Sequence, residues 1–368
     1  MGLNCGIVGL PNVGKSTIFS ALTSAPAEAA NYPFCTIEPN IGIVSVPDKR
    51  LDKIVELVPT AKVIPATFEF VDIAGLVAGA SKGEGLGNKF LANIREVGVI
   101  AHVVRCFEDE DIIHVNNKID PLSDIETIEI ELALADLDTV SNRLNKLTRM
   151  TRLKGDKEKE SAILIPVLQR LEKALEDGKA ARSLDFSKDE EKLLLDLHLI
   201  TMKPVIYVCN IDEDSIGEEN QFVKLVKEKA EKEKAETVAL CGKIEAEIAG
   251  LDSKEDQAEF LESVGLEESA LNHLIRVAYK TLGLRTFFTA GSDEDRAWTF
   301  KAGSKAPQAA GVIHTDFEKG FIKAEVYNVE DLFEFKSEQK VREKGKFRLE
   351  GKDYLVKDGD IMHFRFNV

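Results

Sequence analysis

The sequence lacks several features that would place the protein in a special class. It contains no run of about 18 apolar residues, so we expect no membrane-spanning helix. Residues 1–9 carry no basic segment ahead of a long apolar stretch, and we expect a first β-strand there rather than a signal peptide. The five cysteines are scattered without a CxxC pair, which indicates neither a zinc site nor a disulfide framework. We therefore expect a cytoplasmic protein with reduced thiols.

An excess of positive charge is also missing. The net charge of −16 argues against a protein that coats nucleic acid with its whole surface, although local basic patches remain compatible with it. With 44% hydrophobic and 30% charged residues, the composition is that of a globular protein. A length of 368 residues predicts two or three domains.

Apolar strand candidates alternate with helical segments over much of the chain. They are Leu3–Gly9, Ile41–Val46, Thr67–Asp72, Val97–Phe107, Val205–Asn210 and Thr237–Cys241. This alternation predicts an α/β fold with a mostly parallel sheet that is covered by helices on both faces.

The alternation stops between Pro121 and Met202. Apolar residues recur there at helical spacing in successive runs, separated by the charged stretch Gly155–Glu160, which predicts an inserted antiparallel helical hairpin. After about Leu282 the aromatic content rises, short strands are indicated, and basic and acidic residues balance, as in a separate domain. The predicted domains are a nucleotide-binding domain in two parts (1–120 and 203–280), the hairpin (121–202) and a C-terminal domain (281–368).

A phosphate-binding loop is predicted directly after the first strand. The run Gly9-Leu-Pro-Asn-Val-Gly14-Lys15-Ser16 matches G-x-x-x-x-G-K-[ST] and opens a helix. Glycines let backbone N–H groups face phosphate oxygens, and the helix N-terminus favours negative charge. Lys15 is expected between the β- and γ-phosphates, and the Ser16 hydroxyl on Mg²⁺. The predicted nucleotide-binding residues of this loop are Gly9, Asn12, Val13, Gly14, Lys15, Ser16 and Thr17.

A second motif, Asp72-Ile-Ala-Gly75, follows the strand that ends at Asp72. A strand-end aspartate beside the phosphate loop would hold Mg²⁺ through water, and Gly75 would offer its N–H to the γ-phosphate; the alternative is a structural aspartate before a glycine-rich loop. Thr36 lies where a first switch is expected and is our second direct Mg²⁺ ligand, although a lone threonine in a loop is usually a turn residue.

The base site is expected at the end of the strand Val205–Asn210. Guanine-binding switches read the base with N-K-x-D, whereas this chain has Asn210-Ile211-Asp212-Glu213, without the lysine and with a longer acid. Asn210 can offer its amide to adenine N6 and N7, and the Ile211 backbone can meet the base edge. We therefore expect ATP to be preferred, with GTP as an alternative ligand.

Taken together, these motifs resemble those of the YchF (Obg-like ATPase) family. The resemblance also rests on Asn31–Asn40, Asp72–Phe90 and the run His314–Val326, and covers essentially the whole chain. It implies a Ras-like P-loop NTPase domain with an inserted coiled-coil hairpin and a C-terminal β-grasp (TGS) domain. It further implies a preference for ATP and association with the ribosome, which we expect on the large subunit.

One position departs from ordinary GTPases. Leu76 stands where Ras-like enzymes place a glutamine that orients the attacking water, and a leucine cannot accept a hydrogen bond from it. Two groups could supply the function. His114 follows the strand Val97–Phe107 at the same sheet edge, although a lone loop histidine is usually solvated. Asn12 could instead help to hold K⁺ near the phosphates.

Two basic clusters stand out in an acidic chain. Arg143, Lys146, Arg149, Arg152 and Lys154 lie together at the predicted tip of the hairpin, and a second cluster covers Lys336–Arg348. A solvated helix face is the ordinary interpretation, but the two clusters also fit an RNA- or ribosome-facing surface. The predicted function is a Mg²⁺-dependent ATPase switch on the ribosome. The alternative is a nucleotide-gated ribosome- or RNA-binding module in which GTP is the physiological ligand and turnover is incidental.

Overall fold

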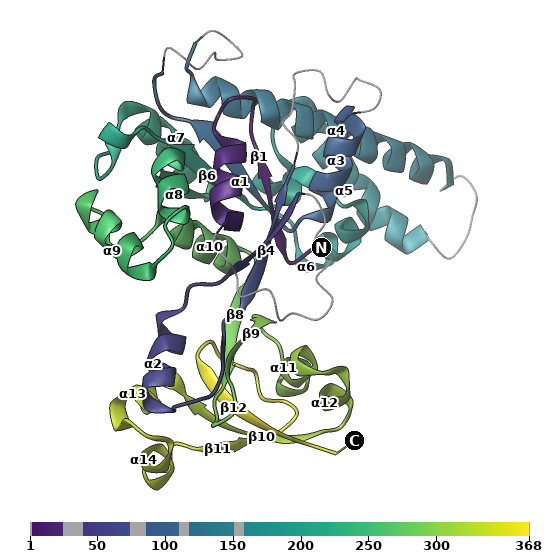
Figure 1. Ribbon diagram of the computed structural model, residues 1–368. Coiled ribbons are helices and arrows are strands. Elements are labelled where there is room, and N and C mark those ends of the chain that lie inside the picture. Colours follow the sequence, from purple (N-terminus) through teal and green to yellow (C-terminus); the bar gives the residue numbers. More distant parts are fainter. Residues whose placement is uncertain (1, 25–39, 74–85, 110–117, 151–157, 368) are drawn as a thin grey trace. The chain divides into compact units, whose positions relative to one another are not determined.

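The computed structural model describes residues 2–24, 40–73, 86–109, 118–150 and 158–367. The chain divides into two compact units (Figure 1). Residues 1–42 and 69–274 form the first unit, and residues 43–68 and 275–368 form the second. In the part of the chain that is described, no helix is both long and apolar enough to cross a bilayer.

The first unit is built on a six-stranded sheet with the order β2-β4-β1-β5-β6-β7. Its strands are β1 (Asn4–Val8), β2 (Ile41–Ser45), β4 (Thr67–Asp72), β5 (Val99–Arg105), β6 (Val205–Asn210) and β7 (Glu236–Leu240). β1 pairs in parallel with β4 and β5, and the parallel ladder continues through β6 to β7. Every residue of β5 and β6 is buried, as expected of central strands covered on both faces. The predicted parallel α/β sheet is therefore confirmed.

Helices follow the strands along the chain, as the alternation predicts. They are α1 (Lys15–Ser24), α3 (Leu86–Glu96), α7 (Gln221–Glu233), α8 (Gly242–Ala249), α9 (Lys254–Ser263) and α10 (Ala270–Thr281). Local capping sets some of their ends. The Asn220 side chain accepts from the Val223 N–H at 2.9 Å at the start of α7, and Lys234 ends that helix in a left-handed conformation.

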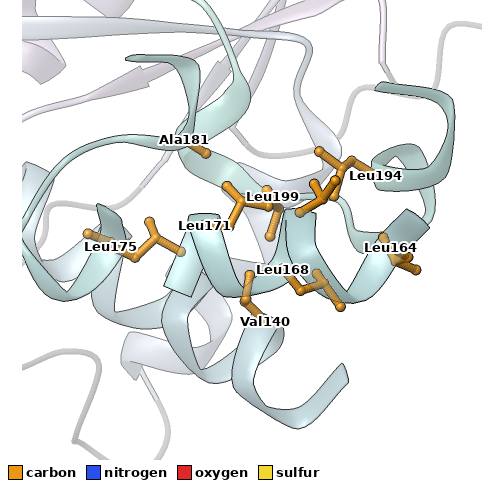
Figure 2. Close-up of a cluster of buried hydrophobic side chains, with 10 residues drawn as sticks. Val140, Leu164, Leu168, Leu171, Leu175, Ala181, Leu194 and Leu199 are labelled. Carbon is orange, nitrogen blue, oxygen red and sulfur yellow. The ribbon is translucent and has the colours of Figure 1, made fainter. Parts of the chain in front are cut away.

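The predicted helical hairpin is confirmed. Helix α4 (Pro121–Met150) packs against α5 (Glu158–Glu176), and the short helix α6 (Lys188–Leu194) follows. Figure 2 shows the apolar cluster that holds them together, with side chains from α4, from α5 and from the segment that returns to the sheet. Its fully buried members include Val140, Leu168 and Leu171. The hairpin thus has a core of its own, which explains the regular apolar spacing in this stretch.

The second unit contains a mixed sheet with the order β11-β10-β12-β8-β9-β3. The strands are β3 (Val63–Ile64), β8 (Leu284–Thr289), β9 (Asp295–Lys301), β10 (Phe321–Asn328), β11 (Arg348–Glu350) and β12 (Asp360–Phe366). The helices are α2 (Lys49–Leu57), α11 (Ala306–Ile313), α12 (Thr315–Lys319), α13 (Val329–Phe335) and α14 (Glu338–Glu343). A core rich in aromatic residues, with Phe287, Phe300 and Phe321, explains the high aromatic content after Leu282.

The division of the chain differs from the predicted domain boundaries at residues 275–280 and, more extensively, at residues 43–68. We predicted residues 43–68 as part of the nucleotide domain, but the structure places them in the second unit. β3 pairs in parallel with β9, and Arg50 Nη1 on α2 donates to Asp358 Oδ2 at 2.8 Å. These partners lie more than two hundred residues further along the chain, so nothing in the local sequence indicates the pairing.

Candidate functional site

The loop between β1 and α1 has the shape that its glycines predict. Gly14 adopts a left-handed φ of 93°, and a Cβ there would lie 2.1 Å from Asn210 Nδ2. A Cβ on Gly9 would lie 2.8 Å from the Val103 carbonyl oxygen of β5. Both positions therefore need glycine, Gly14 because of its backbone conformation as well as its contact.

Three polar residues of the phosphate-loop motif lie in the loop or in the first turn of α1. Asn12 has a φ of 63°, a left-handed conformation that asparagine tolerates better than most residues. Ser16 and Thr17 are exposed in the first turn of α1, next to the helix N-terminus. The loop thus offers hydroxyl groups and a helix N-terminus on one surface, an arrangement that suits a phosphate group.

Lys15 and Asp72 meet in the structure, a contact that the two motifs did not predict. The Lys15 ammonium forms an ion pair with the Asp72 carboxylate. The strands explain the meeting, since Ile7 of β1 lies opposite Asp72 of β4 in the parallel ladder. The Asp72 carboxylate and the Ser16 hydroxyl are hard oxygen donors of the kind that Mg²⁺ prefers, so the residues fit a magnesium ion.

Asn210 does more than the sequence predicted, because it fastens the phosphate loop. Its Nδ2 donates to the Val13 carbonyl at 2.9 Å, and its Oδ1 accepts from the Gly242 N–H at 2.9 Å. The side chain is buried at the carboxyl end of β6. Because an amide carries a second Nδ2 hydrogen and a second Oδ1 lone pair, these two bonds do not use the whole hydrogen-bonding capacity of Asn210. Sequence reasoning missed the contact with Gly242, although its place at the start of α8, two residues after β7, is a usable signal.

The residues after Asn210 are also held by named contacts. The Ile211 N–H donates to the Leu240 carbonyl at 2.9 Å, so this backbone donor is already engaged within the sheet edge. The Asp212 carboxylate accepts from the Ser215 N–H at 2.9 Å and caps a 3-10 turn. Glu213 forms an ion pair with Lys243, the second residue of α8. We refer to Lys15, Asp72, Asn210, Glu213 and Lys243 as the carboxyl-edge cluster.

Four predicted site residues lie outside the described residues: Thr36, Gly75, Leu76 and His114. The structure does describe the start of the loop that carries His114. Arg105, buried at the end of β5, donates to the carbonyl oxygens of Phe107 at 3.2 Å and Asp109 at 3.0 Å. This loop therefore leaves the sheet at the same carboxyl edge as the phosphate loop.

Sequence reasoning missed a polar cluster where the hairpin joins the sheet. We define the hairpin root as Glu129, Arg182, Tyr207, Lys229 and Glu233, which come from four different segments. The Tyr207 hydroxyl on β6 donates to Glu233 at 2.8 Å and lies 3.1 Å from Glu129. Arg182 lies 2.9 Å from Glu129, and Lys229 lies 2.9 Å from Glu129 and 2.6 Å from Glu233. Burial opposes charge on Glu233, but its bonds to Lys229 and Tyr207 keep its pKa below the usual range.

The first basic cluster is described only in part, and the second is described in full. Lys146 and Arg149 are exposed on the last turns of α4, whereas Arg152 and Lys154 lie outside the described residues. In the second cluster, Arg342 pairs with Glu325 at 3.2 Å and Lys346 with Asp331 at 3.2 Å. These carboxylates offset part of the positive charge that the sequence run suggests.

The fold and the site define the class of protein to which the chain belongs. A parallel sheet, a glycine loop that leads into a helix, a paired Lys15 and Asp72 and an asparagine that grips the loop are the parts of a P-loop nucleotidase. Residues 4–143 match the family model described as "50S ribosome-binding GTPase" (MMR_HSR1). Residues 284–367 match YchF-GTPase_C, described as "Protein of unknown function (DUF933)".

Comparison with whole chains identifies the family. The chain is 54% identical to "Ribosome-binding ATPase YchF" of Bacillus subtilis and 56% identical to that of Haemophilus influenzae, and each alignment covers 100% of both chains. The solved structure of the Schizosaccharomyces pombe YchF GTPase is 37% identical with a TM-score of 0.89, over 99% of this chain and 97% of that one. The chain belongs to the YchF family. The family resemblance and the fold predicted from the sequence are thus confirmed.

Proposed function

We propose that the protein is an ATPase that binds ATP with Mg²⁺ and acts as a nucleotide-dependent switch on the ribosome. The observation that carries the proposal is the carboxyl edge itself, where Asn210 holds the phosphate loop and Lys15 meets Asp72. Full-length relatives named ribosome-binding ATPases support the activity and the partner.

The phosphate groups would lie against Gly9 and residues 12–17, with the Lys15 ammonium as their counter-ion. Ser16, Thr36 and Asp72 would hold Mg²⁺, which supplies charge neutralisation at the phosphates when bound. Lys15 would then exchange its ion pair with Asp72 for phosphate oxygens. Gly75 would offer its backbone N–H to the γ-phosphate.

The base would lie at Asn210, Ile211 and Glu213, with ATP preferred over GTP. The direct test is a binding titration of ATP and GTP on the purified protein. We expect ATP to bind at least about tenfold more tightly, a difference of about 1.4 kcal/mol. The double variant Ile211→Lys with Glu213→Asp restores the guanine motif and should move the preference toward GTP. A tenfold preference of the unmodified protein for GTP would contradict the proposal.

Hydrolysis would be slow without help, because Leu76 offers the attacking water no acceptor. His114 is our candidate for orienting or deprotonating that water. The alternative is K⁺ held near the phosphates with the help of Asn12. Exchange of K⁺ for Na⁺ in an ATPase assay separates the two, since only the second mechanism requires the potassium ion.

The partner would be the ribosome, on its large subunit, with RNA contacted by the hairpin tip and by the basic run Lys336–Arg348. Affinity should then fall as salt rises. Reversal of Arg149, Arg152 and Lys154 to glutamate should weaken co-sedimentation with ribosomes without changing ATP affinity. The same reversal at Lys188 and Lys192 of α6 is the control, and equal losses in both variants would contradict a specific surface. A ribosome-bound ATPase of this kind would act in the cytoplasm.

Leu76 also keeps a second function open, a nucleotide-gated ribosome- or RNA-binding module in which GTP is the physiological ligand and turnover is incidental. Turnover that rises strongly on addition of ribosomes favours the enzyme. Ribosome affinity that does not respond to ATP or GTP contradicts the gated module.

A further inference from the structure

An ion pair not indicated by any motif lies beside the proposed base site. Glu213 follows Asn210 by three residues, and Lys243 follows Gly242 by one. Asn210 binds Gly242 directly, so the 3-10 turn that begins at Glu213 and the start of α8 with Lys243 are both close to a residue that also holds the phosphate loop. Lys243 Nζ pairs with Glu213 Oε1 across them.

The pair involves the carboxylate that stands in the place of the guanine-reading aspartate. Guanine presents two donors to such a carboxylate, N1–H and the N2 amine, and a bidentate contact uses both carboxylate oxygens. Adenine lacks this pair of donors. A carboxylate with one oxygen held by an ammonium group is therefore a poorer acceptor for guanine than a free one.

The neighbouring acid is engaged in a local contact. Asp212 is shorter and closer to the guanine-reading length, but its Oδ1 accepts from the Ser215 N–H and caps the 3-10 turn. The bond to Glu213 raises the pKa of Lys243, so the ammonium group stays charged at neutral pH.

We propose that Lys243 determines base specificity by occupying the Glu213 carboxylate and so disfavouring guanine nucleotides relative to adenine nucleotides. The inference rests on the proposed function, since it assigns part of the ATP preference to one side chain. Both side chains are well exposed, at 72% for Lys243 and 46% for Glu213, and exposed ion pairs contribute little to folding stability. Substitution of Lys243 therefore tests recognition without unfolding the protein.

The test is a set of ATP and GTP titrations on the full chain. Lys243→Met should raise GTP affinity relative to ATP by about tenfold. Lys243→Arg keeps the positive charge and should keep the ratio of the unmodified protein. Adding Glu213→Gln to Lys243→Met removes the freed carboxylate and should remove the gain. Lys227→Met is the matched control. Lys227 on α7 forms a similarly exposed ion pair with Glu219, which lies just before that helix.

Inosine triphosphate sharpens the test. It has the N1–H of guanine but no N2 amine, so its gain in Lys243→Met should be smaller than that of GTP. An unchanged ATP-to-GTP ratio in Lys243→Met would overturn the proposal, and so would a loss of ATP affinity with unchanged GTP affinity. A preference of the unmodified protein for GTP contradicts the ATP proposal itself, whereas an ATP preference that survives Lys243→Met contradicts only the role of Lys243.

Discussion

The carboxyl-edge cluster and the hairpin root use the same kinds of side chain for different ends. At the edge, Lys15 and Asp72 lie where parallel strands end and exposed hydroxyls of α1 adjoin them. At the root, Glu129 and Glu233 are each bound by Arg182, Lys229 and Tyr207. The root charges pair with one another within the fold, whereas we propose that the edge charges exchange partners for a ligand. Loss of an edge residue should therefore cost binding, and loss of a root residue should cost stability.

The largest expected effect comes from a substitution in the carboxyl-edge cluster. Lys15→Ala removes the counter-ion of the β- and γ-phosphates, and ATP affinity should fall at least about a hundredfold, or about 3 kcal/mol. The measurement is an ATP titration with Mg²⁺, with urea unfolding as the companion. Unchanged ATP affinity would remove the loop Gly9–Thr17 from the site. A large loss of stability in Lys15→Ala would contradict the expectation that edge residues serve binding and hairpin-root residues serve stability.

The next effect tests burial near the root. Asp136 of α4 is fully buried and accepts from the Ile200 N–H at 2.9 Å and from both the N–H and the hydroxyl of Thr201 at 2.7 Å. Asp136→Ala leaves these donors unpaired and should lower the free energy of unfolding by about 3 kcal/mol. Urea unfolding measures the loss. Asp138→Ala, at an exposed position of the same helix, is the control and should change stability little. Equal losses of stability in Asp136→Ala and Asp138→Ala would contradict the stabilising role given to the buried hydrogen bonds of Asp136.

A third prediction separates catalysis from ATP binding at the carboxyl edge. If His114 orients or deprotonates the attacking water, His114→Ala should lower turnover by roughly a hundredfold while ATP affinity stays nearly unchanged. Only the neutral imidazole accepts a proton, so turnover should rise with pH through the histidine's pKa. Single-turnover ATPase rates from acidic to mildly basic pH provide the measurement. Identical profiles for both proteins would shift the role to Asn12 with K⁺.

The smallest effect concerns His102, buried on β5 with its ring centroid 5.9 Å from that of Tyr207. Burial, helped by the charges of Arg182 and Lys229 and opposed by Glu233, lowers the pKa of His102 to about 3. The unfolded chain, with a pKa near 6.5, binds this proton first, so stability is lost as pH falls from about 6.5 toward 3.

At pH 5 this histidine should account for a loss of about 2 kcal/mol relative to pH 7. Urea unfolding of the unmodified protein and of His102→Gln at both pH values measures it, because the difference between their pH slopes isolates this residue from the other histidines. Equal slopes would show that His102 does not titrate on unfolding. ATP affinity at pH 7 should be the same in both proteins, unlike in Lys15→Ala.

Local patterns of residues determined a large part of this protein. The strand–glycine loop–helix run at residues 4–24, the strand that ends at Asp72 and the helical spacing after Pro121 each depend on neighbours within a few turns of chain, so they can be read from one sequence. The position of Asp72 beside the phosphate loop could also be predicted, because parallel strands bring their carboxyl ends to one edge.

Only the tertiary structure decided the contacts between distant segments. The pairing of β3 with β9, the grip of Asn210 on Val13 and Gly242, the pairing of Lys243 with Glu213 and the hairpin root join residues whose spacing has no period. A periodic pattern reports which face of an element is buried, but it carries no information about which distant side chain lies against that face. Those partners are set by packing, and packing is a property of the whole fold.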